Sequence, residues 1–159
     1  MADWDARVAK FWAGAAELTE DEVITAMEAL AAERPESDGA ALYERASAFD
    51  FVGREAEAEP LYRRALDAGL DAERQPQAVI QLASTLRNLG RADEAVALLE
   101  PETRGHLGDG LDDARTAFLA LALIDAGRPA EGAARALLAL SDHLSRYQRA
   151  VASYARDLL

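Results

Sequence analysis

Apolar side chains recur along the chain at the three- and four-residue spacing of an amphipathic α-helix. In the central part, each such segment is followed by a short turn that contains Gly, and then by a second apolar segment with the same spacing. Before each turn a small and a large apolar residue lie three positions apart, as Ala46 and Phe49 do, so both face one side of a first helix. Gly and Pro are scarce and β-branched runs are absent, so the pattern predicts helices and no strands.

The pattern of helix, turn and helix occurs three times at a fixed interval of 37 residues. Three Gly-Arg pairs mark the turns, and each Arg is followed three residues later by a Glu. The pairs are Gly53-Arg54, Gly90-Arg91 and Gly127-Arg128, with Glu57, Glu94 and Glu131. Small residues recur early in the second helices, at Ala58, Ala95 and Gly132, where the two helices must approach closely. A shared period carried by helices alone is typical of a helical repeat array, and we expect such an array to bind partners rather than to catalyse.

On these residues the sequence resembles the tetratricopeptide repeat (TPR) family. That family has a large, a small and a large apolar residue in its first helix, Gly in the turn and Ala early in its second helix. The matching residues are Leu42, Ala46, Phe49, Gly53, Ala58, Tyr62 and Ala65 in the first copy, Val79, Leu82, Ala83, Leu86, Gly90, Ala95 and Leu99 in the second, and Leu119, Ala120, Leu123 and Gly127 in the third. The resemblance covers roughly residues 39–144 and implies an all-α superhelix of antiparallel helix pairs, with about nine helices.

The chain departs from the family pattern in three respects. The interval is three residues longer than the usual 34, Arg45 stands at an expected aliphatic core position, and Leu70, Leu107 and Leu144 stand where the family usually has Pro. Two prolines, Pro60 and Pro101, fall inside predicted second helices, where each should kink the helix or end it early.

The two ends of the chain each carry a further helical pattern, which completes a single predicted domain over residues 1–159. Residues 1–36 form an N-terminal cap or degenerate repeat, with an apolar stripe that contains Trp4 and Trp12 and with a capping box at Thr19 and Glu22. The stripe could instead form a dimer interface. Residues 145–159 form a C-terminal capping helix after the three repeats at 39–144. Its predicted apolar stripe consists of Tyr147, Ala150, Val151, Tyr154, Ala155 and Leu158.

Composition narrows the classes of partner. The formal net charge of -12 disfavours nucleic acid and anionic membranes, because the field of the protein repels phosphate. There is no Cys, no signal-peptide pattern and no apolar run long enough to span a bilayer, so we expect a cytoplasmic protein.

Candidate chemistry is sparse, and we expect no catalytic residues, no cofactor and no metal site. The only histidines, His106 and His143, do not pair with carboxylates at metal-binding spacing; we expect His106 in a surface loop and His143 in the last turn of a helix. Asp109, Asp112 and Asp113 lack the calcium-loop pattern, and we expect them to cap the next helix.

If the function is recognition, the resemblance implies a partner-binding groove lined by the first helix of each repeat. The residues at such positions are Tyr43, Ser47, Asp50, Gln77, Ile80, Ser84, Arg87, Asn88, Leu121 and Ile124. The apolar run from Phe118 to Ile124 is either buried on all sides or leaves Leu121 and Ile124 as a docking patch for a peptide or for another copy of the chain. The sequence thus predicts a non-catalytic adaptor that binds an unidentified protein or peptide. The alternatives are a structural homodimer, or a small-molecule-binding or enzymatic domain with a pocket in the groove.

Overall fold

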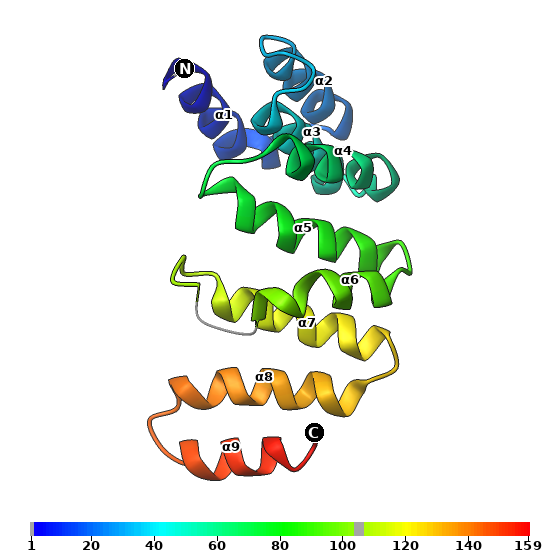
Figure 1. Ribbon diagram of the computed structural model, residues 1–159. Coiled ribbons are helices and arrows are strands. Elements are labelled where there is room, and N and C mark those ends of the chain that lie inside the picture. The colour runs from blue at the N-terminus through cyan, green and yellow to red at the C-terminus, as the bar shows by residue number, and fades with distance from the viewer. Residues whose placement is uncertain (1, 104–106) are drawn as a thin grey trace. The chain divides into compact units, whose positions relative to one another are not determined.

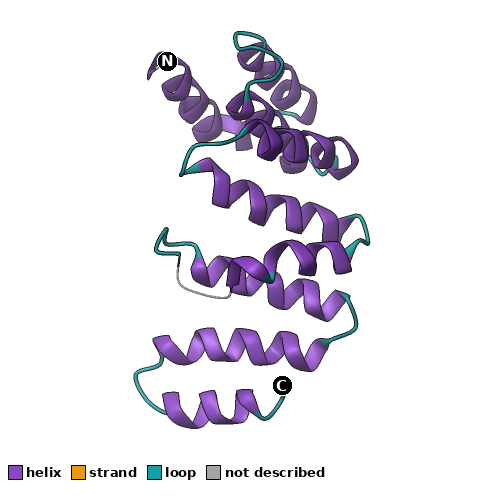
Figure 2. Ribbon diagram, in the orientation of Figure 1, coloured by secondary structure: helices purple, strands orange, loops and turns teal. Residues whose placement is uncertain are grey.

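The computed structural model describes residues 2–103 and 107–159, and in that part of the chain every regular element is a helix (Figures 1 and 2). The helices in order are α1 (Ala2–Gly14), α2 (Glu20–Ala31), α3 (Gly39–Phe51), α4 (Glu55–Ala68), α5 (Arg74–Asn88), α6 (Ala92–Leu99), α7 (Asp112–Asp125), α8 (Pro129–His143) and α9 (Gln148–Arg156). Two short 3-10 helices, η1 (Ala15–Glu17) and η2 (Pro101–Thr103), follow α1 and α6. The predicted all-α fold is confirmed.

The three Gly-Arg pairs form the same turn between α3 and α4, α5 and α6, and α7 and α8. Each Gly has a positive φ, between 73° and 78°, which an L side chain rarely adopts. The amide of the following Arg donates to the carbonyl five residues earlier at 2.8 Å in all three turns, and the Gly amide donates to the carbonyl three residues earlier. This pair of bonds is the Schellman motif, which satisfies the last carbonyls of the first helix.

The Arg and Glu of each turn then stabilise the start of the second helix. Arg54 pairs with Glu57 at 2.7 Å, Arg91 with Glu94 at 2.6 Å and Arg128 with Glu131 at 2.7 Å. The Glu lies in the first turn of its helix, where a negative charge also interacts favourably with the helix dipole.

The described residues up to Ala78 form one compact unit, and those from Val79 onward form a second. In the first unit α3 packs against α4 and α2 packs against α3. Trp4 and Val8 of α1 are buried with Ala31 and Ala41, and the Trp4 indole donates to the Leu30 carbonyl at 2.9 Å. The Trp-rich stripe is therefore used in packing within this unit. The predicted capping box is confirmed, because the Thr19 amide donates to Glu22 at 2.8 Å and the Glu22 amide donates to the Thr19 hydroxyl.

In the second unit α6 packs against α7, α7 against α8 and α8 against α9, and the last three helices lie side by side (Figure 1). At Gly132 of α8 the two helices α7 and α8 approach closely, since an added Cβ would lie 2.6 Å from the Ala120 carbonyl oxygen of α7. This contact explains why the third repeat has Gly where the first two have the buried Ala58 and Ala95.

Pro60 and Pro101 have different effects on their helices. An early helix end was wrong for Pro60, because α4 continues from Glu55 to Ala68. Pro60 is exposed in the second turn, and the buried Ala58, Leu61, Tyr62 and Ala65 hold the helix by packing. At Pro101 the expectation is confirmed, since α6 ends at Leu99 and Pro101 begins η2.

The predicted apolar stripe of the C-terminal helix was wrong in part, because only Val151 and Ala155 of its residues are on the face that packs. Tyr147 precedes α9 in the left-handed conformation and is 77% exposed, and Tyr154 is 72% exposed. Ala152, which was not in the predicted stripe, lies with Val151 and the fully buried Ala155 on the packed face. Small residues allow α9 to lie close to α8, and the tyrosines fall outside that contact.

The acidic cluster at the start of α7, Asp109, Asp112 and Asp113, was expected to cap the helix, and that expectation was wrong. Leu111 is the N-cap residue, and no side chain caps the helix there. Asp109 instead forms a bidentate ion pair with Arg115, and Asp112 lies 3.3 Å from the same guanidinium. Arg115 is completely buried. The cluster therefore neutralises a buried cation and fixes residues 107–111 against α7.

Two further observations concern the expectations on histidine and membranes. His143 is the last residue of α8, as predicted, and its Nε2 lies 2.9 Å from Asp113, whereas His106 lies outside the described residues. None of the helices in the described ranges is both long and apolar enough to cross a membrane.

Candidate interaction surfaces

The predicted groove residues of the first unit take part in an internal network of hydrogen bonds. Tyr43 is only 6% exposed, and its hydroxyl lies 3.4 Å from the Gln77 amide oxygen. Ser47 is also buried. The Tyr62 hydroxyl donates toward Asp50 at 3.3 Å and lies 3.4 Å from Ser47. These side chains satisfy one another, so Tyr43 and Ser47 offer little surface to a partner, while Asp50 and Gln77 are half-buried.

A charged cluster that sequence reasoning missed lies beside this network. Glu44 of α3 is buried, and its two oxygens accept from the Trp12 indole at 2.7 Å and from Arg74 at 3.1 Å. Arg74 also pairs with Asp71 at 2.6 Å and with Asp5 at 2.8 Å. Burial raises the pKa of Glu44, although the bonds from Trp12 and Arg74 oppose that shift.

A pocket of about 550 Å³ opens next to Glu44 and Arg74. A buried carboxylate with a raised pKa in a pocket is a common feature of active sites. Here, however, both carboxylate oxygens are bonded and the cation is shared among three carboxylates. We therefore interpret the cluster as a structural tie between α1, α3 and the start of α5.

The predicted groove residues of α5 in the second unit differ in their accessibility. Ile80 is 7% exposed and Ser84 is half-buried, whereas Asn88 is exposed near the end of the helix. Arg87 forms an ion pair with Asp125 of α7 at 2.7 Å. That pair joins the ends of the two helices and engages the Arg87 guanidinium within the second unit.

The apolar run of α7 is buried on one side and open on the other. Leu119, Ala120, Ala122 and Leu123 are buried, but Leu121 is 43% exposed and Ile124 is 46% exposed. Ala117, one turn earlier, is exposed as well. An apolar strip of adjacent turns therefore remains on the surface of α7, and the salt bridge between Arg87 and Asp125 lies at its end.

Within the described ranges, no group of three or more His, Asp or Glu side chains is arranged so that it could hold a metal ion. Asp109 and Asp112, which come nearest to an acidic site, face the cation of Arg115, and that contact lowers the pKa of Asp109. Sequence reasoning could have found Arg115, because the 37-residue interval relates it to Ala41, Ala78 and Ala152, all small residues.

Comparisons with known proteins agree with the repeated turns and paired helices. The profile of the family described as tetratrico peptide repeat matches residues 39–158, which cover the three repeats and the whole of α9. Neither a search of curated proteins nor a search of solved structures returned a match. Folds of this family are generally non-catalytic, and they typically bind protein partners. On the profile match and the helix pairs, the chain belongs to the tetratricopeptide repeat family.

Proposed function

We propose that the chain is a protein-interaction module or adaptor that binds a peptide or protein segment on the exposed face of α7, with no chemistry of its own. The observation that carries the proposal is the exposure of Leu121 and Ile124 on a helix whose other large aliphatic side chains, Leu119 and Leu123, are buried. Exposed apolar side chains on adjacent turns of a helix are the kind of feature that protein partners cover.

Polar groups at the end of this strip would supply specificity. Arg87, 20% exposed, and Asp125, 42% exposed, present both signs of charge next to Ile124. Asn88 and Ser84 on α5 add hydrogen-bonding side chains in the same unit. An apolar centre with a polar rim is the usual composition of a protein interface. Tyr43, Ser47 and Ile80 are buried, so we do not include them in the contact surface.

Partner capture with matched variants tests the proposal. The intact chain, a Leu121→Ser/Ile124→Ser variant and a Leu137→Ser/Leu140→Ser variant would be used to retain proteins from the native cell extract. Leu137 and Leu140 are a suitable control, because they lie on α8 with the same spacing and comparable exposure, 37% and 51%. We expect a partner that the α7 variant loses and the α8 variant keeps. A partner retained by both, or lost by both, contradicts a docking surface on α7.

Light scattering on the same three proteins identifies the occupant. The adaptor proposal requires a wild-type monomer, or a dimer that the α7 substitutions leave intact. A wild-type dimer that dissociates only in the α7 variant would identify a second copy of the chain as the occupant, in place of a different protein.

A further inference from the structure

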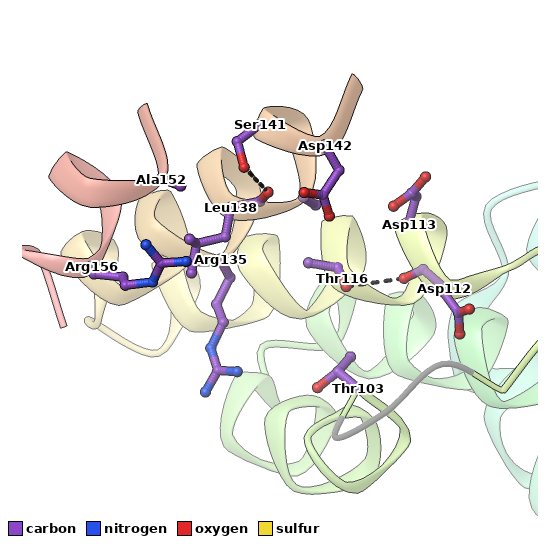
Figure 3. A pocket seen from close by; sticks show the side chains of 11 residues that line it. Thr103, Asp112, Asp113, Thr116, Arg135, Leu138, Ser141, Asp142, Ala152 and Arg156 are labelled. Atoms are coloured by element: carbon purple, nitrogen blue, oxygen red, sulfur yellow. Dashed lines mark hydrogen bonds between the residues drawn. The ribbon is translucent and has the colours of Figure 1, made fainter. Parts of the chain in front are cut away.

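A second pocket lies in the second unit, away from the proposed docking strip. It is lined by residues of α7, α8 and α9 together with Thr103 of η2, and its volume is about 410 Å³ (Figure 3). Leu121 and Ile124 do not line it. Its volume falls in the range of about 300–1,000 Å³ that is typical of pockets for drug-sized ligands.

The charges in this pocket are separated by sign. Arg135 of α8 and Arg156 of α9 lie at one end, and Asp112, Asp113 and Asp142 lie toward the other (Figure 3). The apolar side chains of Leu138 and Ala152 also contribute to the lining. A ligand that fits this arrangement carries an anionic group and a cationic group with an uncharged stretch between them.

At each end of the pocket, at least one charge is available to a ligand. Among the described residues the side chains of Arg156 and Asp142 have no hydrogen bond or ion pair. Arg135 reaches Glu131 only at 3.6 Å, and its Nε atom is buried without a hydrogen-bond partner. In contrast, Asp112 and Asp113 are already engaged by Arg115 and His143. The charges that have no partner among the described residues are therefore Arg156 and Asp142, whereas Arg135 has the long ion pair with Glu131.

We propose that this pocket binds a short peptide segment with a basic and an acidic side chain a few residues apart, the basic group at Asp142 and the acidic group at Arg156. A purely anionic ligand would face three carboxylates, and the net charge of -12 would repel it. A purely cationic ligand would leave both arginines without a counter-charge. A dipolar peptide satisfies both ends and places its uncharged stretch against Leu138 and Ala152.

NMR titration of the full chain tests this site with defined probes. The probes are peptides with acetylated and amidated ends, in which one to three alanines separate Lys from Glu, in both orders. The matched controls replace Lys, Glu or both by Gln. We expect saturable shifts of the amides of Asp142, Ala152 and Arg156 with at least one dipolar peptide, and weaker binding of every control. Absence of saturable shifts for the whole series, or equal binding of the uncharged peptide, overturns the proposal.

Substitutions in the pocket then test the assigned contacts. Because exposed ion pairs contribute little energy, Arg156→Gln should weaken the dipolar peptide by about 2- to 5-fold. The same substitution should not change the affinity of the peptide that has Gln in place of Glu. Conversely, Asp142→Asn should weaken the dipolar peptide but not the peptide that has Gln in place of Lys. If a substitution weakens the dipolar peptide and the peptide that lacks the matching charge by the same factor, the assigned contact is contradicted. Leu121→Ser/Ile124→Ser should bind the peptides as the wild type does, so failure of this site and failure of the α7 surface are distinguishable.

Discussion

Single residues define the repeat through the backbone geometry of its turns. Gly53, Gly90 and Gly127 are required because the chain reverses through a positive φ. The Arg that follows donates its amide to the first helix, and its side chain pairs with a Glu of the second helix. One five-residue pattern thus ends one helix and begins the next, which explains why these positions repeat more faithfully than the helix surfaces.

Replacing the Gly of the central turn should destabilise the protein. In Gly90→Ala the residue must either keep φ near 74°, where the added Cβ is strained, or break the bond from the Arg91 amide to Leu86. We expect the free energy of unfolding to fall by about 1–2 kcal/mol, measured by urea denaturation. Gly14→Ala is the control, because Gly14 has a negative φ and open space around its Cβ position. An equal effect of the two substitutions would contradict the strain argument.

The helices could be predicted from the sequence where the turn residues and the spacing of apolar residues indicated the same boundaries. The two helices on either side of each Gly-Arg turn, the capping box of α2 and the end of α6 before Pro101 are all confirmed. The predicted stripe of α9 was right for Val151 and Ala155 and wrong for the two tyrosines, because its spacing is compatible with more than one apolar face and the packing on α8 selects the face with small residues. Pro60 also shows that tertiary packing can override a local signal, because the burial of apolar side chains along α4 outweighs the cost of a Pro inside the helix.

The candidate site was less predictable than the fold. The run from Phe118 to Ile124 is apolar on every face, so periodicity could not indicate that Leu121 and Ile124 stay exposed. The cluster of Glu44 and Arg74 depends on contacts between residues 30 positions apart in the sequence. The pocket of Arg135, Arg156 and Asp142 depends on how α7, α8 and α9 pack together. No local pattern encodes such contacts.

The tie between α1, α3 and α5 predicts a specific pH dependence of stability. Burial raises the pKa of Glu44 in the folded state above its unfolded value, so the folded protein binds more protons in that pH range. The contribution of Glu44 to stability is therefore lost as pH rises through its folded pKa. In Glu44→Gln this loss is absent, and the stability of the variant relative to the wild type should increase from pH 4 to pH 8. Urea denaturation across this range measures the difference, and a constant difference would show that Glu44 titrates normally.

At the scale of the whole molecule, the distribution of charge favours a neutral or basic partner. Arg54, Arg91 and Arg128 are paired with Glu residues of their own turns, and Arg74, Arg87 and Arg115 are paired with carboxylates as well. The chain has 29 Asp and Glu but only 17 Lys and Arg, so its net charge of -12 comes from the surplus of carboxylates. Their field should speed the association of a basic segment and slow that of an acidic one, with an effect that weakens as salt is added.

The division into two units predicts that a defect in the third repeat stays local. Gly132→Ala forces a Cβ against the Ala120 carbonyl and should destabilise the second unit by about 1–3 kcal/mol. Repeat arrays are stabilised by neighbouring contacts, so the loss need not reach the first unit. Both tryptophans, Trp4 and Trp12, lie in α1 of the first unit. Their fluorescence reports on that unit alone, whereas far-ultraviolet circular dichroism reports on all helices.

In urea, Gly132→Ala should therefore lose part of its helical signal at lower denaturant than the wild type, while its tryptophan transition keeps the wild-type midpoint. Glu44→Gln provides the comparison, because Glu44 bonds the Trp12 indole directly, so any change in stability should appear in the fluorescence transition. If Gly132→Ala instead shifts both signals equally, the two units unfold as one cooperative structure, and contacts across the whole array, rather than between neighbouring helices, set its stability.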